Sequence, residues 1–172
     1  WNCSSCDAGF FSAPESSSCS SCLAGTFSGA EASSCTTCSA GKISPTDEAT
    51  GCQNCLAGNF SQAGDSICTH CAPGKVSAGD AASSCSDCVA GRYQERKGQT
   101  ACDRCSAGMY SAAVGATSSA VCSNCAKGKY APSQGMDACV DCEAGKYQED
   151  GGQSSCSLCG FGKYSTATRA KL

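Results

Sequence analysis

The sequence predicts a small disulfide-rich repeat protein, an elongated rod of about ten short β-hairpin-like rungs with little or no helix. Three observations predict it. Cysteine supplies 20 of the 172 residues, a fraction typical of disulfide scaffolds. Leu, Ile, Val and Phe together supply only 16, too few for an ordinary hydrophobic core. All the cysteines fall into ten Cys-x-x-Cys pairs. We therefore expect cross-links, rather than burial, to hold the fold.

One continuous array of ten repeats accounts for residues 1–172. The steps between successive pairs are 16 or 17 residues, except for a step of 20 in repeat 7, whose additional residues lie around 112–119. In such an array each repeat is expected to contact only its neighbours, and the array is predicted to be a fragment of a longer one. Repeats 1–10 begin at Cys3, Cys19, Cys35, Cys52, Cys68, Cys85, Cys102, Cys122, Cys139 and Cys156.

Each repeat has the same internal pattern. A glycine follows the second cysteine by three residues, and a large apolar residue follows that glycine by two, as in Gly9 and Phe11 or Gly108 and Tyr110. Glycine at a fixed place indicates a positive φ or a close backbone approach. By strand alternation, the residue after the glycine points outward and the large residue points inward, onto the disulfides. Small polar residues then form a return bend.

Two chemical interpretations of the cysteines compete. Cys-x-x-Cys pairs a dozen residues apart resemble Cys₄ zinc sites. Against this stand the unbroken run of pairs, the scarcity of basic residues and the single histidine, His70. Disulfides stabilise chains that are too poor in apolar residues to fold alone, in oxidising compartments. We therefore favour disulfides, predict no metal site, and expect no redox role, since no βαβ pattern surrounds the pairs.

Two disulfide arrangements fit the repeat. In a ladder, the second cysteine of one pair bonds the first of the next; in an interlocked scheme, Cys3–Cys19 and Cys6–Cys22 would recur five times. We prefer the ladder because it treats all ten units alike. It leaves Cys3 and Cys159 to pair outside residues 1–172. The predicted bonds are Cys6–Cys19, Cys22–Cys35, Cys38–Cys52, Cys55–Cys68, Cys71–Cys85, Cys88–Cys102, Cys105–Cys122, Cys125–Cys139 and Cys142–Cys156.

Composition and pattern exclude several function classes. The net charge of −3 gives no nucleic-acid footprint. No apolar run reaches the length of a membrane span. The single histidine and the acid pairs Asp47-Glu48 and Glu149-Asp150, which we expect to be solvated in return bends, offer no catalytic arrangement and no cofactor site. Residues 1–84 carry a charge of −5 and residues 85–172 carry +2. A solvated surface explains this distribution, and the alternative is that ends of opposite charge favour staggered or head-to-tail contact between copies.

The string Cys105-Ser-Ala-Gly-Met-Tyr110-Ser, followed by Cys122-Ser-Asn-Cys125, resembles the ephrin-receptor-like cysteine-rich repeats. It is also similar to the simplest submodule of tumour-necrosis-factor-receptor cysteine-rich domains. In that submodule the cysteine before Gly-x-Tyr pairs with the next cysteine, which implies the ladder here. The alternating six-cysteine modules of those receptors are missing. Long arrays of such repeats look like the secreted or surface proteins of algae and other protists, including flagellar hairs.

These observations predict an extracellular or cell-surface structural protein, a building block or spacer of a filament, coat or flagellar-hair-like (mastigoneme-like) assembly. The expected partners are other copies of itself or other filament and surface components. The alternative is a receptor or adhesion ectodomain that binds a protein ligand, with repeat 7 as its distinct patch. Asn59 is a candidate N-glycosylation site, Asn2 is a weaker one, and exposed Ser and Thr could carry O-glycans.

Overall fold

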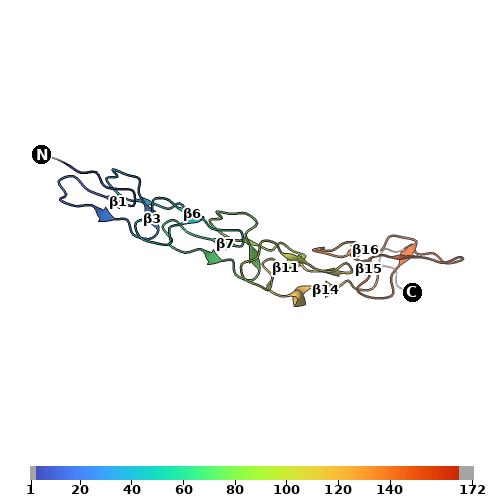
Figure 1. Ribbon diagram of the computed structural model, residues 1–172. Helices are drawn as coiled ribbons and strands as arrows, with labels where there is room; N and C mark the ends of the chain where they lie inside the picture. Colours follow the sequence, from blue (N-terminus) through green and yellow to red (C-terminus); the bar gives the residue numbers. More distant parts are fainter. Residues whose placement is uncertain (1–2, 167–172) are drawn as a thin grey trace. The chain divides into compact units, whose positions relative to one another are not determined.

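The computed structural model describes residues 3–166 and consists of short antiparallel hairpins joined by turns (Figure 1). The described residues contain 18 strands of two residues each, paired into nine two-stranded sheets. Their only helix is η1 (Ser119–Val121), a 3₁₀ turn in the lengthened repeat 7. The predicted fold class, a small disulfide-rich repeat protein with almost no helix, is confirmed.

Each hairpin joins two successive repeats. Its first strand is the glycine-x-aromatic segment of one repeat, and its second strand is the pair of residues between the cysteines of the next repeat. In the first hairpin, for example, Phe10 lies opposite Ser21 and Phe11 opposite Ser20. The strands are β1 (Phe10–Phe11), β2 (Ser20–Ser21), β3 (Thr26–Phe27), β4 (Thr36–Thr37), β5 (Lys42–Ile43), β6 (Gln53–Asn54), β7 (Asn59–Phe60), β8 (Thr69–His70), β9 (Lys75–Val76), β10 (Ser86–Asp87), β11 (Arg92–Tyr93), β12 (Asp103–Arg104), β13 (Met109–Tyr110), β14 (Ser123–Asn124), β15 (Lys129–Tyr130), β16 (Val140–Asp141), β17 (Lys146–Tyr147) and β18 (Ser157–Leu158).

The chain divides into two compact units. One comprises residues 3–72 of the described chain with Val76–Ser86 and Lys97–Thr100, and the other comprises Pro73–Lys75, Asp87–Arg96 and residues 101–166. Both units contain the same hairpin. Every contact between repeats described below lies inside one unit or the other.

The core of each unit consists of small side chains. The second cysteine of every pair from Cys6 to Cys142 is buried, and the residue after the aromatic position is buried in repeats 2–8, as Ser28 and Ser61 are. The Ser28 hydroxyl donates to the Phe10 carbonyl at 2.9 Å, and the Ser61 hydroxyl donates to the Lys42 carbonyl at 3.2 Å. These bonds satisfy the buried hydroxyls.

The expectation that the large apolar residues form the core is therefore wrong. Phe11, Phe27 and Tyr93 are only half-buried. A two-residue strand is too short for one face to be covered by a second layer, so the aromatic side chains stay partly accessible. Backbone groups, cysteines and serines fill the interior instead. Apolar burial consequently contributes little stabilisation per repeat.

Candidate functional site: the interface between repeats

Nine disulfides join the second cysteine of one pair to the first cysteine of the next. They link Cys6–Cys19, Cys22–Cys35, Cys38–Cys52, Cys55–Cys68, Cys71–Cys85, Cys88–Cys102, Cys105–Cys122, Cys125–Cys139 and Cys142–Cys156. The linked residues are 13 to 17 positions apart, with Cα atoms separated by 5.5–5.8 Å. Each bond encloses one strand and one return bend. The closed loop has few conformations to lose on folding, and this stabilises a chain with little core.

Two cysteines remain as free thiols. Cys3 is exposed and Cys159 is half-buried. They are the first and last cysteines of the array, and their pairing outside residues 1–172 stays a prediction.

Backbone hydrogen bonds connect each repeat to the next one. The amide of each repeat glycine donates a hydrogen bond to a carbonyl in the following repeat, that of the residue just after the aromatic position. The N–O distances are 2.7–3.0 Å, as from Gly9 to Ser28 and from Gly108 to Ala131. In the opposite direction, the amide of a bend residue donates to the backbone carbonyl of the buried cysteine in the preceding repeat at 2.7–2.9 Å, as from Glu31 to Cys6. These bonds use main-chain groups, so they recur even where the side chains differ.

A third contact reaches the repeat after next. A Cβ atom placed on Gly25 would lie 2.0 Å from the carbonyl oxygen of Gly64, and one on Gly108 would lie 2.0 Å from that of Gly152. Seven glycines from Gly9 to Gly108 show this relation, at 2.0–2.3 Å, each with a bend carbonyl two repeats further on. The expectation that each repeat contacts only its neighbours is therefore wrong. It failed because the glycine lets the next-but-one backbone approach where any side chain would block it.

The bend residue that supplies this carbonyl adopts a left-handed conformation. Its φ lies between 55° and 83° in nine successive repeats, and the residues are Glu15, Glu31, Glu48, Gly64, Ala81, Gly98, Gly115, Gly135 and Gly152. From Glu48 to Gly152, the same residue donates its amide to the cysteine carbonyl of the preceding repeat and presents its own carbonyl to the glycine of the repeat before that. The left-handed turn aims both groups at once.

Two aspartates add a side-chain contact that sequence reasoning missed. The carboxylates of Asp47 and Asp80 each accept a hydrogen bond at 2.8 Å from an amide 23 residues earlier, that of Ala24 and of Ala57 respectively. Bend acids were expected to be merely solvated. The signal was available in their shared position, since each stands one residue before the left-handed position.

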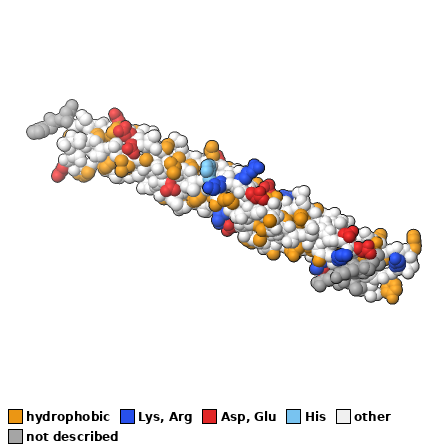
Figure 2. All heavy atoms as spheres, turned by 90° about the horizontal axis from the view of Figure 1, so that it is seen from below, with side chains coloured by type: hydrophobic (Ala, Val, Ile, Leu, Met, Phe, Trp, Pro, Cys, Tyr) orange, Lys and Arg blue, Asp and Glu red, His pale blue; other side chains and the backbone are white. Residues whose placement is uncertain are grey.

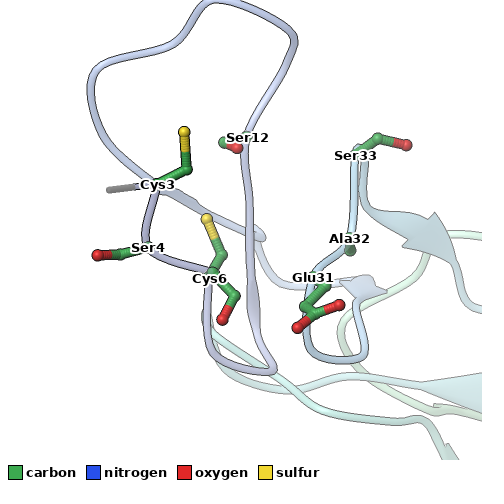
Figure 3. A pocket seen from close by; sticks show the side chains of 8 residues that line it. Cys3, Ser4, Cys6, Ser12, Glu31, Ala32 and Ser33 are labelled. Atoms are coloured by element: carbon green, nitrogen blue, oxygen red, sulfur yellow. The ribbon is translucent and has the colours of Figure 1, made fainter. Parts of the chain in front are cut away.

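Two cavities lie at the N-terminal repeat. One has a volume of about 330 Å³ and is lined by residues of repeats 1 and 2, among them Cys3, Cys6, Ser12 and Glu31. Figure 3 shows the Cys3 and Cys6 side chains on one side of it and the Glu31–Ser33 bend on the other. The second has a volume of about 530 Å³ and is lined by Cys3, Ser4 and the bend up to Cys19. Serine supplies about half of the residues that line each cavity.

The structure describes only one of the two asparagines in N-glycosylation sequons, Asn59. Asn59 is half-buried in β7, and its Nδ2 atom donates to the carbonyls of Leu56 and Ala57 at 3.0 and 3.3 Å. A glycan on Nδ2 would have to replace one of these bonds. Its Oδ1 atom lies 2.5 Å from Nδ1 of His70 in the neighbouring strand, so His70 has a side-chain partner here. Asn2 lies outside the described residues.

Charged side chains are scattered over the face shown in Figure 2. Hydrogen bonds from the backbone and hydroxyl of Ser119 hold the pKa of Glu95 below its ordinary value, and the Ser119 amide lies 2.9 Å from the carboxylate. Lys146 lowers the pKa of Glu143 in the same way, while Glu143 raises the pKa of Lys146. Among residues 3–166, no group of three or more His, Cys, Asp or Glu could hold a metal ion.

Comparison with known families places these repeats. A family model described as tyrosine-protein kinase ephrin type A/B receptor-like matches residues 74–122 and 128–171. The chain belongs to this ephrin-receptor-like family. The matched segments cover more than half of the sequence, and the unmatched repeats have the same cysteine and glycine positions. The chain matches no curated protein sequence.

Membership in the ephrin-receptor-like family, together with nine disulfides, indicates an extracellular or secreted ectodomain. Domains of this family bind proteins, so a protein partner is the general expectation. Within the part of the chain that the structure describes, no helix has the length and apolar character to cross a membrane.

Proposed function

We propose that this chain is an extracellular structural protein, a building block or spacer of a surface filament, coat or flagellar-hair-like assembly. The supporting observation is the interface between repeats, in which disulfides, reciprocal backbone hydrogen bonds and the glycine contact recur with little change from one repeat to the next. Such an interface gives every repeat the same environment and does not vary to create a distinct site. The proposed role is mechanical rather than catalytic.

Localisation in the cells that make the protein tests this proposal. Antibodies against residues 3–166 should label unpermeabilised cells, and electron microscopy should place the label along a filament or coat. The labelled structure should resist protease until a reductant opens the disulfides. Label confined to the interior of permeabilised cells, or to a diffuse plasma-membrane population without any assembly, would contradict the proposal.

A receptor or adhesion ectodomain is the second candidate, favoured by one local departure from the repeat. Repeat 7 carries η1 and an exposed Val114, whose relative exposure is 66%. If this patch binds a protein ligand, Val114→Ser should abolish binding of the isolated chain to cells that display that ligand. Val89→Ser is the matched control, because Val89 is 60% exposed on an ordinary repeat. Equal binding by both variants would remove repeat 7 from consideration.

A further inference from the structure

One hairpin of the array brings two arginines together. In β11 and β12, Arg92 lies directly opposite Arg104. Two other hairpins pair a lysine with an acid at the same position, and these pairs are Lys75–Asp87 and Lys129–Asp141. Like charges on directly opposite strand residues destabilise a hairpin. The Arg92–Arg104 pair therefore works against folding, and an anion bound between the two side chains would remove the repulsion.

Arginine is concentrated at this hairpin. The protein has four arginines, and three of them, Arg92, Arg96 and Arg104, lie within residues 92–104. This segment holds four bases and two acids, a net charge of +2 in a protein whose net charge is −3. A guanidinium group presents its donors in a planar fork that binds an oxyanion through two parallel hydrogen bonds, which a lysine ammonium group cannot do. The concentration of arginine thus indicates an oxyanion as the ligand.

The two acids of this segment do not neutralise the arginine pair. The Glu95 carboxylate accepts a hydrogen bond from the Ser119 amide at 2.9 Å. Asp103 precedes Arg104 in β12, and neighbouring strand residues point to opposite faces of a hairpin, so its carboxylate lies on the other face. In the part of the chain that the structure describes, no ion pair involves Arg92 or Arg104. The pair is therefore available to an external anion.

The following repeat supports one of these side chains. A Cβ atom on Gly135 would lie 3.5 Å from both Cγ and Cδ of Arg104. Because Gly135 has no side chain, the methylene groups of Arg104 lie beside its backbone, and the charged group extends beyond them. Arg104 is exposed and Arg92 is half-buried, and both belong to the same compact unit as Gly135. The structure thus holds the pair in place and leaves it accessible.

We propose that the hairpin of β11 and β12 binds a sulfate ester group of an extracellular sulfated polysaccharide. The sulfate group lies between the guanidinium groups of Arg92 and Arg104 and accepts hydrogen bonds from both. It supplies the negative charge that an aspartate supplies in the hairpins of Lys75 and Lys129. This inference rests on the extracellular location of the family and not on the proposed structural role.

Two features favour a sulfated polymer as the occupant. The guanidinium group is weakly hydrated, and a sulfate ester is likewise easier to dehydrate than a carboxylate, so arginine at this position matches sulfate. A polymer also presents several anionic groups, and binding of the first raises the local concentration of the next. Arg96 follows Arg92 by four residues, which is at most about 14 Å along the chain. A neighbouring sulfate group of the same polymer can therefore reach Arg96.

Binding of the full chain to polymers that differ only in their charged group tests the ligand. Dextran sulfate and carboxymethyl dextran of equal length and charge density are titrated into the protein at physiological ionic strength, and calorimetry gives the affinity. Dextran sulfate should bind about tenfold more tightly than carboxymethyl dextran. Inorganic polyphosphate, the third probe, should also bind more weakly than dextran sulfate. Absence of dextran sulfate binding, or equal binding of either other polymer, would overturn the proposal.

Two matched variants test the position of the site. Arg104→Asp places a carboxylate opposite Arg92 and should weaken dextran sulfate binding by about tenfold or more. Lys42→Asp is the control, because Lys42 is exposed and occupies the same strand position in an ordinary hairpin, opposite Asn54. It changes the net charge by the same amount and should change the affinity little. Equal losses in the two variants would show that only overall charge matters and would overturn the site.

A gain of binding completes the test. The double variant Lys75→Arg, Asp87→Arg builds a second arginine pair in the hairpin of β9 and β10. The position suits an arginine, since the Asp87 side chain already lies beside the bend residue Gly115, as Arg104 lies beside Gly135. This variant should bind dextran sulfate more tightly than the wild-type chain, and unchanged affinity would overturn the role of the pair. Surface localisation tests the proposed function independently, so a surface assembly whose chain does not bind dextran sulfate would refute this inference alone.

Discussion

The first five repeats and the next four differ at the left-handed bend position. Glu15, Glu31, Glu48 and Ala81 occupy it in the first group, where only repeat 4 has glycine, whereas all four later repeats have glycine. A residue with a Cβ is strained at positive φ, by roughly 1–2 kcal/mol. Two of the three described ion pairs, Lys129–Asp141 and Lys146–Glu143, lie beyond repeat 5, and the third joins Lys75 of repeat 5 to Asp87 of repeat 6. The comparison teaches that the same left-handed backbone conformation is kept in all nine repeats, while its conformational free-energy cost depends on whether the residue is glycine.

The largest loss of stability should come from blocking the glycine contact with a methyl group, and the loss should be equal in both regions. Gly25→Ala and Gly108→Ala each place a Cβ 2.0 Å from a backbone oxygen, so strain and overpacking together should cost about 4 kcal/mol. Denaturant unfolding with disulfides intact measures this cost. Gly79→Ala, whose Cβ would meet nothing within 4 Å, should change stability little. A cost confined to one region would show that the contact matters only there.

Removal of one disulfide should be the next largest effect. The pairs Cys38–Cys52 and Cys125–Cys139 both join residues 14 positions apart, so replacing either pair with alanines should cost about 3 kcal/mol. Amide hydrogen exchange around each site would report the local loss. Because the loops are matched, a difference above about 1 kcal/mol would mean that the glycine bends and ion pairs of the later region support its hairpins independently.

Exchange of residues at the bend tests the comparison directly. Ala81→Gly should stabilise the protein by about 1 kcal/mol, since it relieves a φ of 55°. Gly135→Ala should destabilise by about the same amount, because its Cβ has room and only the conformation is unfavourable. Unfolding midpoints of the two variants against wild type give the answer. Changes of the same sign would refute a shared left-handed requirement.

The smallest effect concerns Glu95, whose carboxylate binds Ser119 at the start of η1. Its pKa is lower in the folded state than in the unfolded chain, so its contribution is present above the unfolded pKa. That contribution is lost as the pH falls through the folded pKa. Hydrogen exchange at the Ser119 amide should therefore lose protection in acid, after correction for the intrinsic rate. Glu95→Gln should remove this pH dependence, and an unchanged profile in that variant would contradict the assignment.

The fold class was predictable because every cysteine belongs to a Cys-x-x-Cys pair and a glycine follows each pair by three residues. The composition of the core was not predictable. Alternation of apolar and polar residues does not reveal that the strands are only two residues long, and such short strands leave Phe11 and Tyr93 half-buried. The contact two repeats away was equally hidden, since the carbonyls of Glu48 and Gly64 serve it alike and backbone groups have no sequence signal. Asp47 and Asp80 could have been found from their common place before the left-handed residue.

The cross-linking pattern determines how the chain would respond to tension. Force applied at the two ends would travel through the disulfides and the Cys-x-x-Cys segments, which hold the second strand of each hairpin. It would bypass the first strand and the return bend that each disulfide encloses. Three extended residue steps span about 11 Å, and each disulfide adds a Cα separation of 5.5–5.8 Å. A reduced repeat of 17 residues could instead stretch to about 60 Å. The oxidised chain would thus bear load with less than a third of that extension, and the loops that the disulfides close would remain unloaded.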